Sequence, residues 1–212
     1  MCYFNKRLLF ILIASVVVFS GCASKGKKDG EMDPAALGED GSLILIPSPY
    51  VAGEVPGPAK REFAAVKALM EQKKWKEAVG SLELMTATYP TLSGPYVNLG
   101  IAHFQLKEFE EAEKALKFAI ETNPLNFDAY TQLGYLLRDQ GRFEEAEQNY
   151  LAALALWPHH LESAYNLGIL YDLYMGRFED ALKYYVLSQQ ILGGEDRQLK
   201  GWIVDLQRRM EQ

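Results

Sequence analysis

The sequence has few of the residues that build metal sites and disulfide frameworks. Among 212 residues there are only two cysteines, Cys2 and Cys22, and three histidines. A disulfide requires those two cysteines to pair, and a Cys/His metal site lacks its usual ligand set. Excess positive charge is also absent, because 22 basic residues stand against 28 acidic ones, a net charge of −6. We therefore expect no metal and no nucleic-acid partner.

Sequence signatures of catalysis are missing as well. The chain contains no glycine-rich phosphate loop, no nucleophile elbow and no HExxH pattern. These absences predict a protein that is not an enzyme and needs no cofactor. What remains is 49% apolar and 24% charged, which is the composition of a folded globular chain.

The first 21 residues contain no acidic side chain and read as an export signal. Lys6 and Arg7 precede an apolar run over residues 8–19, which is too short for a spanning helix of about 20 residues. The run ends in the residues Phe-Ser-Gly before Cys22. This ending resembles the lipobox of bacterial lipoproteins. The alternative is an uncleaved signal anchor with an incidental cysteine.

The lipobox resemblance implies cleavage before Cys22, which would then carry the lipid that binds the chain to a membrane. Loss of Lys6 and Arg7 changes the net charge from −6 to −8. Ser24 stands where an Asp retains lipoproteins in the inner membrane. The resemblance therefore implies an outer-membrane anchor, with the protein facing the periplasm.

Residues 22–58 are rich in glycine, proline and charge, and they show no helical apolar period. This composition predicts a flexible lipidated tether. Residues 42–47 (SLILIP) differ, because four consecutive apolar residues are unusual in a linker. They could cover the first helices, offer a strand to a partner sheet, or remain disordered.

The rest of the chain repeats with a period of 34 residues. Three residue types keep this period in phase, except that the last alanine follows after 35 residues. Three similar segments, KEFEEA, GRFEEA and GRFEDA, follow one another in the same phase. The repeating positions are Pro90, Pro124 and Pro158; Gly100, Gly134 and Gly168; and Ala78, Ala112, Ala146 and Ala181.

This pattern resembles the tetratricopeptide repeat, a helix–turn–helix unit of 34 residues. The resemblance covers residues 59–194 and implies an all-α solenoid of four repeats, at 59–92, 93–126, 127–160 and 161–194. Residues 195–212 read as a capping helix, apolar on one face and charged on the other. The fourth repeat has one extra residue after Gly168, so we expect its turn to be distorted.

The repeated residues have a physical reason. Glycine inside a helix costs about 1 kcal/mol relative to alanine, so we expect it where a neighbouring helix comes close. The alanines serve the same approach from the second helix. The prolines end that helix, because proline cannot continue it.

The resemblance also implies a binding surface on the first helix of each pair. Asn98, Gln132 and Asn166 lie 34 residues apart and form a ladder of amides that could bind the backbone of an extended peptide. The alternative is an ordinary solvated face. The predicted partner-binding residues are Val97, Asn98, Ile101, Thr131, Gln132, Tyr135, Arg138, Tyr165, Asn166 and Ile169.

The three histidines are interpreted without a metal. His103 takes a packing position and is expected in the core, whereas His159 and His160 follow Pro158 and are expected in a solvated turn.

These features together predict a lipid-anchored scaffold that binds a protein or peptide partner of the cell envelope. Tetratricopeptide lipoproteins that resemble it include pilotin-like proteins of type IV pili. Others recruit peptidoglycan hydrolases or accompany TonB/ExbB/ExbD-like complexes. The alternative is a structural subunit that self-associates in an envelope-spanning machine.

Overall fold

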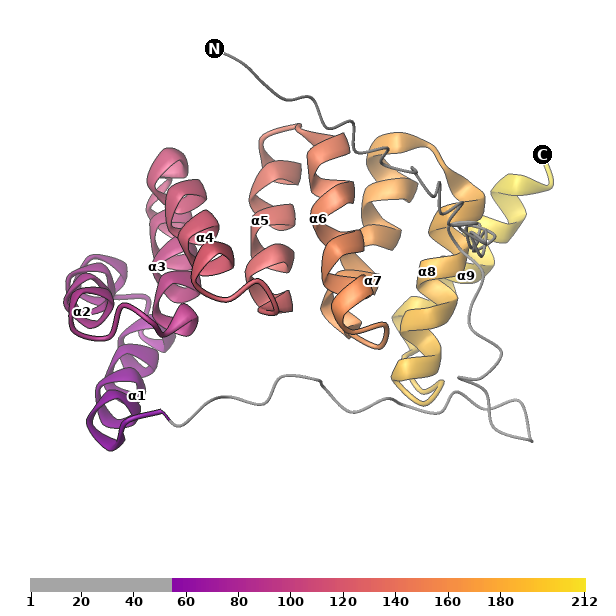
Figure 1. The fold of residues 1–212 in the computed structure, drawn as a ribbon. Coiled ribbons are helices and arrows are strands. Elements are labelled where there is room, and N and C mark those ends of the chain that lie inside the picture. Colours follow the sequence, from indigo (N-terminus) through magenta and orange to yellow (C-terminus); the bar gives the residue numbers. More distant parts are fainter. Residues whose placement is uncertain (1–54) are drawn as a thin grey trace, which may run out of the picture. The chain divides into compact units, whose positions relative to one another are not determined.

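The computed structural model describes residues 55–212 (Figure 1). The predicted signal, Cys22, residues 42–47 and nearly all of the tether lie outside this range. The described chain is helical throughout and has no strand. Its elements are α1 (Gly57–Glu71), α2 (Trp75–Thr88), α3 (Ser93–Leu106), α4 (Phe109–Thr122), α5 (Phe127–Asp139), α6 (Phe143–Leu156), α7 (Leu161–Ile169), η2 (Leu170–Met175), α8 (Phe178–Ile191) and α9 (Arg197–Met210).

Helices that are neighbours in the sequence are neighbours in space. Within residues 55–212 they form four pairs, α1/α2, α3/α4, α5/α6 and α7–η2/α8, followed by α9. The first helices of successive pairs also touch, α3 with α5 and α5 with α7. The predicted all-α solenoid is therefore confirmed for the described part of the chain. Helix α1 begins at Gly57, two residues before the start that the 34-residue period predicts.

The two helices of a pair approach closely at the repeated glycines. A Cβ atom built on Gly134 would lie 2.8 Å from the ring of Tyr150, which is fully buried. Gly100 lies in the same way against Leu116, and Gly168 against Tyr185. The repeated alanines, from Ala78 to Ala181, are completely buried. A side chain at these glycines would force the paired helices apart.

The turn inside each pair is also repeated. The residue two positions before the second helix has a left-handed backbone, with φ between 57° and 76°. The following N–H then bonds five residues back, as when Arg142 donates to the Leu137 carbonyl at 2.9 Å. This is the Schellman ending of a helix. The left-handed residues are Lys73, Lys107, Gly141 and Gly176.

The extra residue of the fourth repeat is absorbed by the π-helix η2. The equivalent turn bond there spans six residues, from the Arg177 N–H to the Tyr171 carbonyl at 2.9 Å. The predicted distortion is thus present, but it widens the end of the first helix and leaves the turn at Gly176 in its usual form. Leu173 and Tyr174, both in η2, are exposed by 66% and 48%.

The turn between α6 and α7 contradicts one expectation. His159 and His160 were expected to be solvated, but they are exposed by only 4% and 7%. Aromatic packing buries His160, whose ring lies tilted at 4.8 Å from that of Phe127 and 5.3 Å from that of Trp157. His103 is buried, and its Nδ1 lies 2.7 Å from a carboxylate oxygen of Glu108.

His160 also belongs to a polar network that joins two repeats. Its Nδ1 lies 2.7 Å from the Ser163 hydroxyl, which is 2.6 Å from that of Thr131, and its Nε2 lies 3.4 Å from Asp128. This Ser–His–Asp set has no exposed nucleophile, because Ser163 is completely buried. The network therefore holds α7 against α5.

Helix α9 takes the place of a further first helix. Its N-cap, Asp196, accepts a hydrogen bond from the Leu199 N–H, as Asn126 does from Ala129 at the start of α5. Leu199 and Leu206 are buried, as the corresponding residues of α5 are. At the position that Gly134 holds in α5, α9 has Val204, which is 59% exposed, and no described helix covers it.

The glycine contact predicts opposite effects for two substitutions. Gly134→Ala should lower the free energy of unfolding by about 1–3 kcal/mol, because its Cβ would overlap Tyr150. Gly80→Ala, in the middle of α2 with open space around it, should raise that free energy by about 0.5–1 kcal/mol. Urea unfolding followed by circular dichroism measures both. Equal effects would contradict the proposed role of the close approach.

The burial of His159 predicts that the stability of the fold depends on pH. Burial lowers the pKa of His159, so the unfolded chain takes up a proton more readily than the folded chain. The contribution of this residue is therefore complete above the ordinary histidine pKa of about 6.5 and is lost as the pH falls through and below that value. His159→Gln should flatten this part of the stability profile, measured by urea unfolding across the window. An unchanged slope would refute the assignment.

Candidate functional site

The candidate site lies on the surface formed by the first helices, at three equivalent positions between neighbouring first helices. We call them the first notch, between α3 and α5; the second notch, between α5 and α7–η2; and the third notch, between α7–η2 and α9. The floor of each is the side chain that faces a repeated glycine: Leu116, Tyr150 and Tyr185 in turn.

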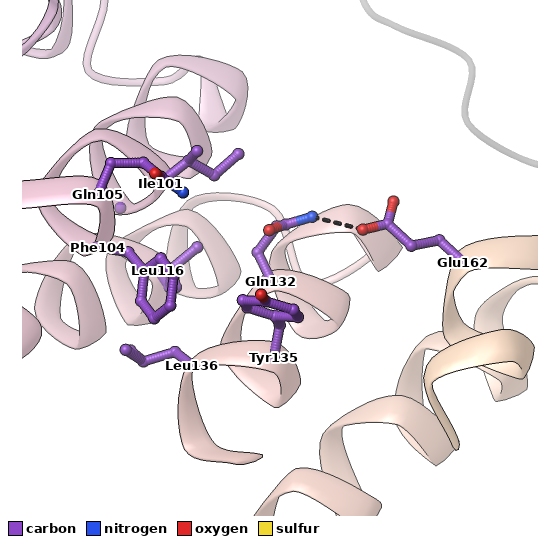
Figure 2. Close-up of a pocket in the computed structure, with 9 residues that line it drawn as sticks. Ile101, Phe104, Gln105, Leu116, Gln132, Tyr135, Leu136 and Glu162 are labelled. Atoms are coloured by element: carbon purple, nitrogen blue, oxygen red, sulfur yellow. Dashed lines mark hydrogen bonds between the residues drawn. The ribbon is translucent and has the colours of Figure 1, made fainter. Parts of the chain in front are cut away.

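The first notch is an open pocket of about 230 Å³ (Figure 2). Ile101, Phe104 and Gln105 line it from α3, and Gln132 and Tyr135 from α5. The rings of Phe104 and Tyr135 meet edge to face with their centroids 5.4 Å apart. Tyr135 remains 37% exposed, so the pocket offers aromatic and apolar area to solvent.

A polar rim adjoins this apolar pocket. Gln132 donates from Nε2 to a carboxylate oxygen of Glu162 at 2.9 Å, the bond drawn in Figure 2. Gln105 is exposed on the opposite side of the pocket. An apolar side chain can therefore enter the first notch while its backbone meets amide and carboxylate groups.

The second notch is filled by Arg138. Its guanidinium donates to the Asn166 amide oxygen at 2.9 Å and lies over the Tyr135 ring at 4.9 Å and the Tyr174 ring at 5.9 Å. These partners are all neutral. By contrast, other arginines pair with carboxylates: Arg142 with Glu113, Arg177 with Glu147, and Arg209 with Asp172.

The ion pairs of Arg142 and Arg177 connect neighbouring repeats. Arg142 reaches back to Glu113 at 2.6 Å, and its hydrogen bonds lower the pKa of that carboxyl. Arg177 reaches back to Glu147 at 2.6 Å in the same way. Each pair links the turn of one repeat to the second helix of the repeat before it.

The third notch is a pocket of about 410 Å³. Tyr185 forms its floor, Leu173 and Trp202 its apolar sides, and Arg209 part of its charged rim. Burial raises the pKa of Tyr185 and so keeps the phenol neutral. Arg209 is neutralised by Asp172 at 2.7 Å and by Asp205 at 3.2 Å.

A third and larger pocket, of about 640 Å³, lies outside the notches. It is an open depression beside the turn between α6 and α7 and the turn between α8 and α9. Its lining is mainly apolar, with Trp157, Tyr165 and Leu192, and it includes the two buried histidines.

The predicted partner-binding residues fall into two groups. Ile101, Gln132 and Tyr135 line the first notch, and Arg138 fills the second. The other group lines neither the pocket of the first notch nor that of the third. Val97, Thr131 and Asn166 are buried. Asn98, Tyr165 and Ile169 are half-buried, with Ile169 packed against the core and Tyr165 stacked on Trp202 beside the larger pocket.

The amide ladder is engaged within the chain. Asn98 donates to the Gly94 carbonyl and Asn166 to the Glu162 carbonyl, both at 2.8 Å, and Gln132 donates to the Glu162 side chain. Each amide therefore keeps only part of its hydrogen-bonding capacity for a partner. The notches are therefore better candidates for partner binding than the amide ladder.

Sequence reasoning missed several residues that line the notches. Phe104, Leu136 and Glu162 line the first, and Leu173 the third. A signal existed for Phe104, because it lies one turn beyond Ile101 on the same helix face. Leu173 had no such signal, since the π-helix sets its direction.

Residues 55–212 contain neither a membrane-spanning helix nor a metal-binding cluster. No helix there combines the length and the hydrophobicity that crossing a membrane requires. No group of three or more His, Cys, Asp or Glu side chains in the described chain is arranged to hold a metal ion.

Comparison with known proteins gives matches to family models and to solved structures. Tetratricopeptide repeat models match residues 94–124 and 126–192. A search of curated protein sequences gave no significant match.

Three solved structures illustrate the similarity. MamA is 26% identical, with a TM-score of 0.55, over 68% of this chain and 82% of that one. YrrB, described as a TPR protein with an unusual peptide-binding site, is 25% identical, with a TM-score of 0.54, over 66% of this chain and 71% of that one. PilF of Pseudomonas aeruginosa is 19% identical, with a TM-score of 0.65, over 72% of this chain and 69% of that one, a likeness of fold alone.

The period of the sequence, the glycine contacts between paired helices, the family models and the solved structures agree on one assignment. Residues 94–124 and 126–192 therefore carry tetratricopeptide repeats, and residues 55–212 fold as a tetratricopeptide-repeat α-solenoid.

Proposed function

We propose that the protein is a lipid-anchored scaffold of the bacterial cell envelope that binds a peptide or a partner protein on its first helices. The observation that carries the proposal is the first notch. It combines exposed aromatic area at Tyr135 with a polar rim at Gln132 and Glu162, which is the usual make-up of a peptide-binding surface.

The similar structures support the binding role. YrrB has a peptide-binding site by its description. Another neighbour, the first TPR of Spaghetti (RPAP3), is bound to an HSP90 peptide. Tetratricopeptide arrays thus serve as protein-interaction modules, and the first notch gives this chain a surface for that role.

The location rests on the sequence. The proposed lipid on Cys22 would anchor the chain in the outer membrane facing the periplasm, and the tether would separate the array from the lipid surface. The partner would then be a protein of the cell envelope, such as a component of a pilus, secretin or TonB/ExbB/ExbD-like machine.

The alternative is self-association end to end through α9. The two helices of a repeat meet at a close glycine contact, and α9 has Val204 at the position of that glycine. Lys200 and Gln207 are also exposed on α9. A helix of another copy would meet a branched side chain and polar groups there, so this observation favours a terminal cap over a stacking surface.

Site-specific photo-crosslinking in intact cells tests the binding role. Benzoylphenylalanine placed at Tyr135 should give an adduct with an envelope protein, because this side chain is exposed in the first notch. The matched control is Gln148, which is exposed on the second helix α6. Equal adducts from both positions would refute binding at the first notch. An adduct of twice the 23.9 kDa chain would instead favour self-association.

Substitution of the lipidation site tests the location. Cys22→Ser should remove the anchor and move the protein from the membrane fraction to the soluble periplasmic fraction, because stable anchoring requires the acyl chains. Cys2→Ser should leave the protein in the membrane fraction, since that cysteine would depart with the signal. Membrane retention of Cys22→Ser would contradict the lipoprotein assignment.

A further inference from the structure

The three notches follow one another along the array. They occupy the same position relative to successive first helices, since their floors are the residues opposite Gly100, Gly134 and Gly168. Packed helices lie about 9 Å apart. An extended peptide advances about 3.3 Å per residue. One step from notch to notch therefore corresponds to about three residues of an extended chain.

The outer notches are apolar pockets, and the middle one carries positive charge. Pockets of about 230 and 410 Å³ open at the first and third notches. In the second, the Arg138 guanidinium contacts only a neutral amide and two tyrosine rings. Among residues 55–212 it has no carboxylate partner, unlike Arg142, Arg177 and Arg209.

The floor of the second notch adds an independent observation. The Tyr150 hydroxyl is fully buried and finds no hydrogen-bond acceptor among the described residues. Burial raises the pKa of this phenol, the Arg138 charge lowers it and the Glu162 charge raises it further. A guanidinium that forms no ion pair among the described residues and a hydroxyl without an acceptor therefore lie in one notch, and both can bond to a negatively charged acceptor.

The π-helix η2 creates the far end of this surface. The extra residue brings Leu173 to the rim of the third notch, where it is 66% exposed. It also brings Tyr174 beside Arg138. Leu173 thereby adds to the apolar area that Tyr185 and Trp202 form in the third notch, and this area is available to a partner.

We propose that the array recognises an extended peptide segment with an acidic residue flanked on each side, three positions away, by a bulky apolar residue. This inference rests on the proposed function and specifies its partner. The two apolar side chains enter the first and third notches, and the carboxylate pairs with Arg138 in the second. Because the pattern is symmetric, it can be read in either chain direction.

Fluorescence anisotropy with the full-length protein and synthetic peptides tests the motif. The labelled probe is Gly-Leu-Ser-Ser-Asp-Ser-Ser-Leu-Gly. Replacing its Asp by Asn should weaken binding about tenfold, the effect of losing a charge-assisted hydrogen bond. A probe with one Ser removed from each side should also bind about tenfold more weakly, because its leucines no longer reach both pockets. Equal affinity of the three probes, or no binding of the first, would overturn the proposal.

Protein variants locate the two contacts. Arg138→Gln should weaken the Asp probe about tenfold and leave the Asn probe nearly unchanged, so the effects of the two substitutions are not additive. Leu173→Ser should weaken both probes about tenfold. Leu84→Ser is the matched control, because Leu84 is 68% exposed on α2, and it should change nothing. Circular dichroism confirms that each variant is folded.

These outcomes separate the motif from the proposed function. If the Tyr135 adduct forms in cells but Arg138→Gln weakens the Asp and Asn probes equally, the array binds its partner without the acidic contact and the motif is wrong. If the variants behave as expected while no adduct forms, the motif stands and the envelope role fails.

Discussion

The close contact between the two helices of each repeat is the constraint on which the rest of the structure depends. At Gly134 the paired helix comes so near that a single added carbon would overlap the Tyr150 ring. This closeness lets the large residue on the second helix reach beneath the first. The same residue forms the floor of a notch on the candidate binding surface. Helix packing and the shape of the candidate site therefore depend on one set of residues.

Departures from the 34-residue period make the three notches different from one another. Identical repeats would present identical notches, and a partner could slip from one to the next. The π-helix places Leu173 beside the third notch, and Arg138 occupies the second. Irregular helical turns of this kind are frequent at functional sites. The array thus combines a regular core, which provides stability, with a surface that has a defined register.

Polar groups between repeats were harder to anticipate. A histidine pair after a proline reads as a solvated turn, yet His160 packs against the rings of Phe127 and Trp157 and bonds to Ser163. Its partners lie far away in the sequence, so no local pattern shows them. The amide ladder was visible at its 34-residue spacing, but the spacing could not show that Asn166 bonds within its own helix and to Arg138.

The helical pairs, the close glycine contacts and the extra residue of the fourth repeat could all be predicted from the sequence. Glycine and proline act on the backbone at their own positions, and the 34-residue period is visible in the order of the residues alone. The sequence did not show where the extra residue is accommodated, which side chains remain exposed, or that Arg138 pairs with no carboxylate among the described residues. Those properties depend on distances between residues about 30 positions apart, which stacking creates and the one-dimensional pattern does not contain.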